Sequence, residues 1–349
     1  MIRAGVVGYG LAGRVFHAPM IAAVEGLELA AVVERSGRAA EQAYPGITTY
    51  PSLDAMLGDA TIELIVVATP NTTHAPFAKQ ALAAGRHVVV DKPVGITSQE
   101  VAEIIAVAKL HDRLFIPFHN RRWDGDFQTL QQLLHAKTLG RIVSFESTFD
   151  RWRPAPRRGV WREDGTPGGG ILLDLGTHVA DQALQLFGLP EAVGAEIVSE
   201  RDNAVTDDAF TIRLRYPHLT VTLGATALAA QPRPRFHVRG THGGFVKSGL
   251  DPQENRLKET GRVVEPNWGT EPPSAWGILA IDVDGGMISK PVETIAGDYR
   301  LYYAAVRDAL LGKAAPPVLA TDALRVSRLL EWASQSSEER REIRCEWDE

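Results

Sequence analysis

The sequence contains a single cysteine, Cys345, among its 349 residues. One thiol excludes an internal disulfide framework and a cysteine-rich zinc site, because each needs several cysteines. Scarcity of cysteine is typical of a reducing compartment. No apolar run reaches about 18 residues, and the N-terminus lacks the long apolar segment and small-residue cleavage site of a signal peptide. We therefore expect a cytoplasmic protein that does not span a membrane.

Basic residues are not in excess either, since 37 Lys and Arg stand against 43 Asp and Glu, giving a net charge of −6. A nucleic-acid partner usually requires a basic surface, so we expect none. With 44% hydrophobic and 23% charged residues, the composition is that of a globular chain rather than a disordered one. At roughly 100–200 residues per domain, the length predicts two domains.

The first third of the chain alternates apolar runs with helical patterns. Strands are predicted at residues 3–7, 28–33, 63–68, 87–90 and 114–118, and helices at residues 12–24, 36–44, 73–84 and 97–111. Continuous β-branched runs at residues 65–67 and 88–90 are typical of strands covered on both faces. Gly85 follows one helix as a cap, and Thr97 with Glu100 forms a capping-box pattern before the next. This alternation predicts an α/β domain with a parallel sheet.

The pattern changes after about residue 118. A helix at residues 124–136 and a strand at 141–149 precede a loop with the arginines Arg151, Arg153, Arg157, Arg158 and Arg162. A glycine-led helix ending near residue 187 is followed by strands at 193–199, 210–216, 220–227 and 235–239, then by helices at 299–311 and 321–337. Residues 249–296 show no assignable pattern. We expect a second, α+β domain with a largely antiparallel sheet that packs one face on helices.

A glycine motif joins the first predicted strand to the first predicted helix. It reads Gly8-Tyr9-Gly10-Leu11-Ala12-Gly13, a G-x-G-x-x-G pattern that in this context is typical of dinucleotide binding. Gly8 permits the tight turn, Gly10 lets the backbone approach a pyrophosphate, and Gly13 lets the helix pack close to the sheet. The helix N-terminus presents N–H groups to the phosphates. An ordinary glycine-rich surface turn is the alternative interpretation.

The residues after the second predicted strand bear on the choice between NAD and NADP. Glu34 stands about where an acidic side chain binds the adenosine ribose hydroxyls, which favours NAD. Arg35, Ser36 and Arg38 follow at once and could hold a 2′-phosphate, although the two arginines also suit a solvated helix start. The sequence leaves the preference unresolved.

Asp91-Lys92-Pro93 follows the strand at residues 87–90. Ligands of open α/β sheets bind beyond the carboxyl ends of the strands, so Lys92 is a candidate to hydrogen-bond a substrate oxygen and stabilise developing alkoxide charge. A solvated surface lysine is the alternative.

The glycine-led helix carries Asp174 and His178, which share one helical face at i and i+4. Histidine titrates near neutral pH and suits general acid–base work, and Asp174 can fix its orientation or bind a substrate hydroxyl. The alternative is an ion pair on a solvated face. No H-E-x-x-H motif occurs, and we predict no metal site.

Together, the glycine motif, the lysine turn and the Asp174/His178 helix resemble the Gfo/Idh/MocA family of NAD(P)-dependent oxidoreductases. Residues 69–74, 118–124 and 249–254 also match, most like the NADP-preferring scyllo-inositol dehydrogenase branch. The family's lysine turn more often begins with Glu, where this chain has Asp91. The resemblance implies a Rossmann domain over residues 1–118. Over residues 119–349 it implies a substrate-binding domain, which dimerises through an open-faced sheet.

The resemblance also assigns residues to roles. It implies a catalytic set of Lys92, Asp174 and His178, and a Pro70-Asn71 turn bordering the nicotinamide. The residues expected to bind the cofactor are Gly8, Gly10, Leu11, Ala12, Gly13, Glu34, Arg35, Pro70, Asn71, His74, Asp91, Lys92 and Asn120. Candidates for substrate contact are Arg122, Trp123, Asp124 and Trp161. The arginine loop at 151–162 is either a plain connection or a contact for a phosphate or an acidic substrate.

From these residues we expect an NAD(P)-dependent dehydrogenase or reductase acting on a secondary hydroxyl, or the matching ketone, of a cyclic polyol or sugar such as an inositol. A redox-assisted NAD-dependent lyase or glycosidase, and a non-enzymatic dinucleotide-binding sensor, are the alternatives. We expect a small-molecule substrate and a homodimer. The sequence does not name the substrate.

Overall fold

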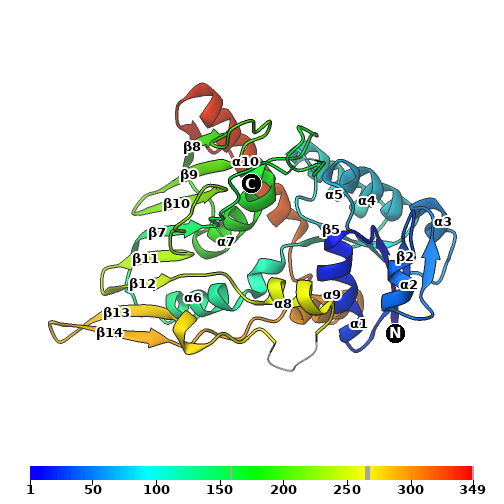
Figure 1. The fold of residues 1–349 in the computed structure, drawn as a ribbon, viewed down its shortest axis with the longest axis horizontal. Helices are drawn as coiled ribbons and strands as arrows, with labels where there is room; N and C mark the ends of the chain where they lie inside the picture. The colour runs from blue at the N-terminus through cyan, green and yellow to red at the C-terminus, as the bar shows by residue number, and fades with distance from the viewer. Residues whose placement is uncertain (158, 264–267, 348–349) are drawn as a thin grey trace. The chain divides into compact units, whose positions relative to one another are not determined.

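The structure is a computed structural model that describes residues 1–157, 159–263 and 268–347 (Figure 1). Arg158 of the predicted arginine loop lies outside the described residues. The chain forms two compact units: residues 1–123, 252–268 and 298–324 make the first, and residues 124–251, 269–297 and 325–349 the second. The first unit thus includes two later segments that a division at residue 118 assigns elsewhere. Within the described ranges, no helix is long and apolar enough to cross a membrane.

The first unit is built on a six-stranded sheet of order β3-β2-β1-β4-β5-β6. Every neighbouring pair is parallel, which confirms the predicted parallel sheet. The strands are β1 (Ile2–Val7), β2 (Leu27–Val33), β3 (Thr48–Tyr50), β4 (Leu64–Val67), β5 (His87–Asp91) and β6 (Phe115–Phe118).

Both faces of this sheet are buried, which explains the continuous apolar runs in its strands. Alternate residues of one strand enter different cores: Val66 packs in one hydrophobic cluster and Ile65 and Val67 in another. Because side chains alternate between the faces of a strand, a sheet covered on both faces needs apolar residues at every position. The continuous apolar runs of the strands therefore indicate the α/β class from the sequence alone.

The helices of this unit follow the predictions in part. They are α1 (Ala18–Ala23), α2 (Ala39–Ala43), α3 (Leu53–Leu57), α4 (His74–Ala83), α5 (Ser98–Leu110), α8 (Gln253–Thr260) and α9 (Arg300–Leu310). Thr97 caps α5 by accepting a 3.2 Å hydrogen bond from the Glu100 amide, and Gly85 follows α4 with φ +76°, as predicted. The α-helix expected at residues 12–24 is wrong in its first half, because Gly13–His17 form a π-helical turn.

The second unit holds a nine-stranded sheet of order β14-β13-β12-β11-β7-β10-β9-β8-β15. All its neighbours are antiparallel except β7 and β10, so the expected largely antiparallel sheet is confirmed. Its strands are β7 (Ile142–Thr148), β8 (Ala192–Val198), β9 (Ala209–Tyr216), β10 (Leu219–Thr226), β11 (Phe236–Gly240), β12 (Gly243–Lys247), β13 (Gly277–Val283), β14 (Gly286–Val292) and β15 (Ile343–Arg344).

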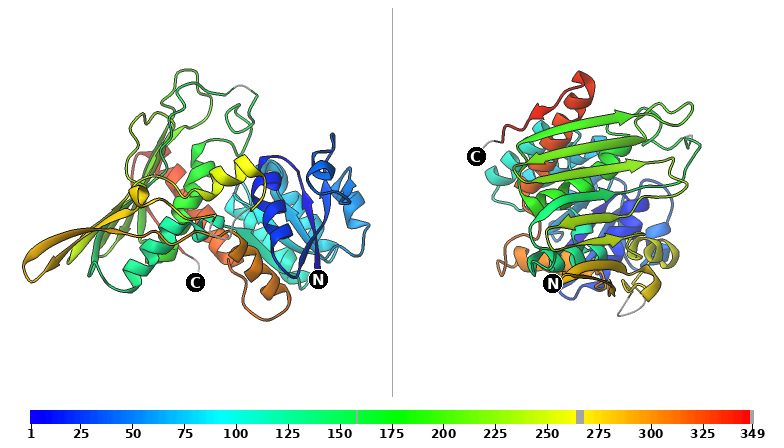
Figure 2. Two further views of the ribbon diagram at one scale, coloured as in Figure 1. Left: turned by 60° about the horizontal axis from the view of Figure 1, so that its bottom comes forward. Right: turned by 90° about the vertical axis from the view of Figure 1, so that its left-hand side faces the viewer.

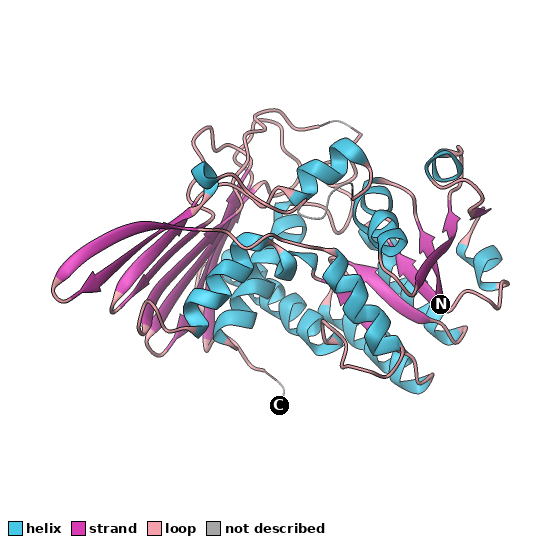
Figure 3. Cartoon of the chain, turned by 90° about the horizontal axis from the view of Figure 1, so that it is seen from below, coloured by secondary structure: helices cyan, strands magenta, loops and turns pink. Residues whose placement is uncertain are grey.

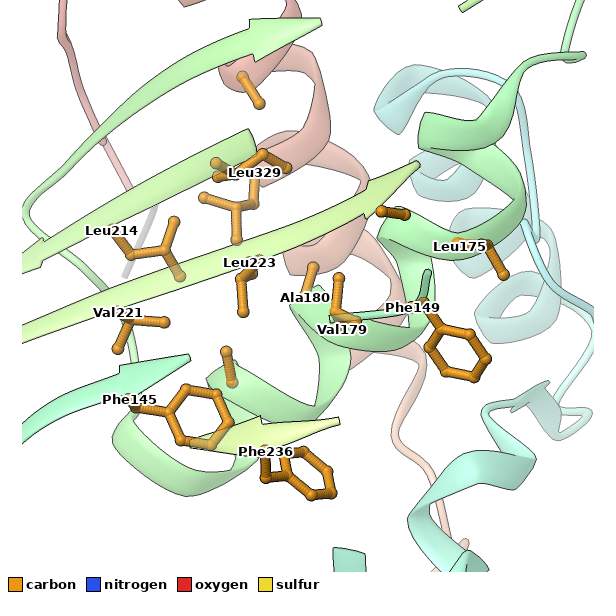
Figure 4. Packing of buried hydrophobic residues seen from close by; sticks show 14 of the residues in the cluster. Phe145, Phe149, Leu175, Val179, Ala180, Leu214, Val221, Leu223, Phe236 and Leu329 are labelled. Carbon is orange, nitrogen blue, oxygen red and sulfur yellow. The ribbon is translucent and has the colours of Figure 1, made fainter. Parts of the chain in front are cut away.

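One face of this sheet packs on helices, among them α6 (Gly125–His135), α7 (Thr177–Phe187) and α10 (Ala320–Glu339) (Figure 3). Phe145, Leu223 and Phe236 from the strands meet Val179 of α7 and Leu329 of α10 in one core (Figure 4). Among the described residues, no helix covers the opposite face (Figure 2, right), and there Val246 and Ile278 form an exposed cross-strand pair. This open face matches the open-faced sheet implied by the resemblance.

Candidate active site

The glycine motif forms the turn between β1 and the π-helical segment Gly13–His17. Gly8 adopts φ +100°, which L side chains rarely reach. A Cβ on Gly13 would lie 2.0 Å from the Gly8 carbonyl oxygen, whereas a Cβ on Gly10 would meet no atom within 4 Å. Gly8 and Gly13 are thus required by the fold, and Gly10 and Leu11 are exposed above the strand end. This open backbone fits the pyrophosphate of a dinucleotide.

Glu34 lies where a ribose-binding acid is expected, but its carboxylate has other partners. Oε1 and Oε2 accept hydrogen bonds of 3.2 and 3.1 Å from the amides of Ala39 and Ala40, at the start of α2. A carboxylate there is also stabilised by the positive end of the helix. The neighbouring side chains of Arg35 and Arg38 are exposed. The acid therefore anchors a helix, and the basic residues face solvent.

His74 connects the Pro70-Asn71 turn to the lysine turn. Its Nδ1 lies 2.7 Å from the Pro93 carbonyl oxygen and its Nε2 lies 2.8 Å from the Thr69 carbonyl oxygen. Burial lowers the pKa of His74, whereas Asp91 and the two carbonyls act in the opposite direction. Because the ring is buried and its two nitrogens lie beside one carbonyl oxygen of each turn, it links the two turns. Its role in cofactor binding stays a prediction.

Asp91 and the buried His17 lie beside the lysine turn, Asp91-Lys92-Pro93. Asp91 Oδ1 accepts a 2.8 Å hydrogen bond from the Lys92 amide, and Oδ2 lies 3.8 Å from His17 Nε2. His17 Nδ1 lies 2.6 Å from the hydroxyl of Tyr303. Burial raises the pKa of Asp91, but the neighbouring His17 and the charge of Lys92 outweigh burial and hold that pKa below its usual value. The Asp91 carboxylate is thus ionised beside Lys92.

Residues 120–123 have partners within the first unit. Asn120 is buried, Arg122 pairs with Asp322 at 3.0 Å, and the Trp123 ring packs edge-on against Tyr302 at 5.3 Å. These contacts give Arg122 and Trp123 structural roles, and their substrate contact stays a prediction.

The second unit carries Asp174 and His178 at the start of α7. Leu172–Gly176 form a π-helical turn, so the α-helical i, i+4 geometry predicted for this pair is corrected: only His178 lies in the α-helix. The Leu172 amide donates a 2.7 Å hydrogen bond to Asp207, which fixes the entry of the turn. π-Helical turns are rare in proteins overall, and those that occur are often found at functional sites.

Asp174 lies between two arginines of the predicted loop. Its Oδ2 is 3.6 Å from Arg151 Nη1 and its Oδ1 is 3.6 Å from Arg162 Nε. The His178 ring lies 6.4 Å from the ring of Phe149, and the Arg151 guanidinium lies 5.9 Å from that same ring. Phe149 thus lies near both Arg151, a partner of Asp174, and His178.

The candidates Asp124 and Trp161 also belong to this unit. Asp124 is 1% exposed and precedes α6, whereas Trp161 is half-buried and stacks on Arg162 at 4.4 Å. Trp161 thus lies beside a partner of Asp174, and Asp124 lies inside the unit.

Two buried groups were not anticipated from the sequence. His17 and Tyr303 meet across 286 residues. Arg235 is 2% exposed, donates to Ser147 and Gln182, and stacks on Phe149 at 4.7 Å. An isolated His in an apolar segment, or an Arg just before a strand such as Arg235 before β11, signals such a role only once its distant partner is known. Among the described residues, no cluster of three His, Cys, Asp or Glu could hold a metal ion.

Comparison with known proteins identifies the family. Residues 2–119 match the oxidoreductase family's NAD-binding Rossmann fold of the Gfo/Idh/MocA type, and residues 131–345 match its C-terminal alpha/beta domain. The chain belongs to the Gfo/Idh/MocA oxidoreductase family. It is therefore an oxidoreductase with an NAD(P)-binding domain, and the resemblance inferred from the sequence is confirmed.

Relatives match over nearly the full length. The chain is 43% identical to the uncharacterized oxidoreductase YdgJ of Escherichia coli (strain K12) over 339 residues, 97% of each protein. It is 32% identical to the scyllo-inositol 2-dehydrogenase (NADP(+)) IolW of Bacillus subtilis (strain 168), over 99% of this chain and 96% of that protein. A solved structure of a putative oxidoreductase from Yersinia pestis superposes with a TM-score of 0.94 at 43% identity, covering 100% of this chain and 98% of the other.

Proposed function

We propose that this oxidoreductase is a dehydrogenase acting on a secondary hydroxyl, or the matching ketone, of a cyclic polyol or sugar such as an inositol. The observation that carries the proposal is the position of Lys92. It follows β5 at the carboxyl edge of the Rossmann sheet, in a turn held by Asp91 and His74. The relative IolW is named as a scyllo-inositol 2-dehydrogenase, which supports the same substrate class.

The chain's own residues have distinct roles in this proposal. The nicotinamide, when bound, accepts or supplies the hydride. His178 takes the hydroxyl proton as general base, which is worth about 10²–10⁴ in rate. Lys92 donates a hydrogen bond to the same oxygen and stabilises its developing negative charge. Asp174, which lies 3.6 Å from both Arg151 and Arg162, accepts a hydrogen bond from a neighbouring hydroxyl.

We also propose that NADP is preferred to NAD. Both Glu34 oxygens are engaged by α2 amides, so the carboxylate is directed to the helix. The exposed Arg35, Ser36 and Arg38 are then the nearest groups to receive a 2′-phosphate. The name of IolW, an NADP(+)-dependent enzyme, points the same way.

The activity is tested with inositols, aldoses and their oxidised forms, using both dinucleotides and following the absorbance of the reduced cofactor. Lys92→Ala and His178→Ala should each lower turnover by at least about 100-fold and leave cofactor affinity nearly unchanged. Near-normal turnover in both variants would contradict the mechanism. Cofactor retained through purification, with substrate consumed but no net reduction, would indicate the redox-assisted lyase or glycosidase instead.

A further inference from the structure

A small cavity in the second unit is lined by five arginines. They are Arg151, Arg153, Arg157, Arg162 and Arg201, and we call their site the arginine cavity. Asp174 also lines it. Its volume is about 40 Å³, which is room for about three water molecules. That space suits one charged group, such as a carboxylate or a phosphate, rather than a whole sugar ring.

Part of the positive charge in the cavity is already balanced. Glu163 pairs with Arg157 at 2.7 Å and with Arg201 at 3.1 Å. Arg201 also pairs with Asp208 at 2.8 Å and is buried. These four side chains form a neutral frame of two arginines and two carboxylates, which holds the loop in place.

The remaining charges leave an excess of positive charge. Arg151 and Arg162 share the single carboxylate of Asp174. Among the described residues, no carboxylate lies within 4.0 Å of the Arg153 guanidinium, and burial together with Arg151 and Arg157 lowers its pKa. The last acid of the lining is Asp207, whose pKa is raised by burial. Its carboxylate accepts a hydrogen bond from the Leu172 amide rather than pairing with an arginine.

The cavity also adjoins the proposed substrate-binding residues. Asp174 is common to both, and the Phe149 ring lies 5.9 Å from the Arg151 guanidinium and 6.4 Å from the His178 ring. The Arg162 guanidinium stacks on Trp161. An anionic group held in the cavity would lie beside Asp174.

We propose that the arginine cavity binds a carboxylate or phosphate group of the sugar or polyol substrate, so that the enzyme acts on acidic or phosphorylated sugars in preference to neutral ones. Guanidinium groups suit such ligands because their planar donors bind two oxygens at once. This inference rests on the proposed function, since it takes Asp174 as part of the substrate site.

The test compares neutral inositols and aldoses with the matching uronates and hexose 6-phosphates, with both dinucleotides. The wild-type enzyme should show a kcat/KM at least about 10-fold higher for the acidic or phosphorylated members. The comparison between uronates and phosphates identifies which anion is bound. Arg153→Ala should raise KM for the preferred acidic substrate by about 10–100-fold, because a hydrogen bond to a charged group is worth about 1.5–3 kcal/mol.

Two controls make the result specific. KM for the dinucleotide and for neutral sugars should change less than about twofold in Arg153→Ala, and Arg153→Lys should retain part of the affinity because it keeps the charge. Arg344→Ala, an exposed arginine of the same unit, should behave as wild type. A rise in KM for the dinucleotide instead would assign the cavity to the cofactor and overturn the proposal.

Direct binding separates this inference from the proposed function. Calorimetry with glucuronate and with inorganic phosphate should show binding to wild type that Arg153→Ala weakens, whether or not turnover is seen. Turnover of neutral sugars alone, with no anion binding, would overturn the arginine cavity and leave the dehydrogenase standing. Arg153-dependent anion binding without turnover of any sugar would support the cavity and contradict the proposed activity.

Discussion

At the scale of single residues, Glu34 shows how one side chain changes role between sequence and structure. The sequence places an acid at the end of β2, where it suits a ribose. In the structure its two oxygens accept the Ala39 and Ala40 amides. A carboxylate so engaged stabilises a short helix, and we propose that the exposed Arg35 and Arg38 discriminate between the dinucleotides.

The double variant Arg35→Ala/Arg38→Ala should raise KM for NADP by about 10–100-fold and leave KM for NAD within about twofold. The reason is the loss of charge-assisted hydrogen bonds to the 2′-phosphate. Steady-state kinetics with both dinucleotides measures it, with Lys109→Ala, an exposed cation of α5, as the control. Equal losses for both dinucleotides would contradict the proposed preference.

Asp91 predicts a pH dependence of stability. Its folded pKa is lowered, so the unfolded state binds the proton more readily. The stabilisation by ionised Asp91 is therefore present above the unfolded pKa of about 3.9 and is lost as pH falls below it towards the folded pKa. The free energy of unfolding of wild type should exceed that of Asp91→Asn above about pH 5.

Urea denaturation of wild type and Asp91→Asn across pH 3–8 measures this difference. The gap between the two proteins should shrink only below about pH 4. A gap that stays the same down to about pH 3 would mean that the carboxyl is not held ionised by its partners.

At the scale of elements, the turns at the carboxyl ends of the Rossmann strands are tied to one another. His74 is the first residue of α4. Its ring nitrogens lie within hydrogen-bonding distance of the Thr69 carbonyl, before the Pro70-Asn71 turn, and of the Pro93 carbonyl, at the end of the lysine turn. The position of Lys92 thus depends on a side chain from a different strand–helix connection. The lysine turn and the Pro70-Asn71 turn form one structural element.

Replacing His74 with Phe should lower the free energy of unfolding by about 1–3 kcal/mol, because it leaves a buried carbonyl without its hydrogen-bond donor. Turnover should fall more than KM for the dinucleotide rises, since Lys92 loses its fixed position. Chemical denaturation and steady-state kinetics measure both, with the exposed Thr72→Ala as the control. Unchanged turnover would show that the lysine turn is positioned without His74.

Elements with strong local signals could be predicted from the sequence, and those without them could not. α5 has a capping residue and an apolar face, and β4 is a continuous apolar run. In contrast, β14 is exposed along nearly its whole length and has no alternating pattern. The π-helical turns at Gly13–His17 and Leu172–Gly176 are five residues long, too short for a hydrophobic period to distinguish them from an α-helix.

The residues of the candidate site likewise fall into those that local sequence motifs indicate and those that depend on distant partners. Gly8, Lys92 and Asp174 stand in local motifs and could be singled out from the sequence. The roles of His17 and Arg201 could not, because each depends on partners that only the fold brings near: Tyr303 for the first, and Glu163 with Asp208 for the second.

At the scale of the whole molecule, the open face of the nine-stranded sheet leaves an apolar pair exposed. Val246 and Ile278 are 36% and 47% exposed, while their neighbours Phe245 and Leu279 are buried on the helix side. Exposed apolar residues on a sheet face are suited to association. The homodimer expected from the resemblance stays a prediction, and this face is where we place it.

Light scattering after size-exclusion chromatography should report a dimer for wild type and a monomer-shifted equilibrium for Ile278→Glu, because a charge on the sheet face opposes its burial. Leu110→Glu changes an exposed leucine of the first unit and should leave the mass unchanged. Monomeric wild type, or a dimer insensitive to Ile278→Glu, would exclude association through this pair.

The discontinuous first unit has a consequence for synthesis of the chain. Tyr302 and Tyr303, from α9, complete a core that also contains Phe118, and the Tyr302 hydroxyl bonds the Pro117 carbonyl across 185 residues. A ribosome adding about 5–20 residues per second needs about 10–40 s to produce that stretch. During this interval the apolar residues that α9 covers in the finished protein, such as Phe118, lack that cover. The core around Phe118 can therefore be completed only after α9 has been synthesised.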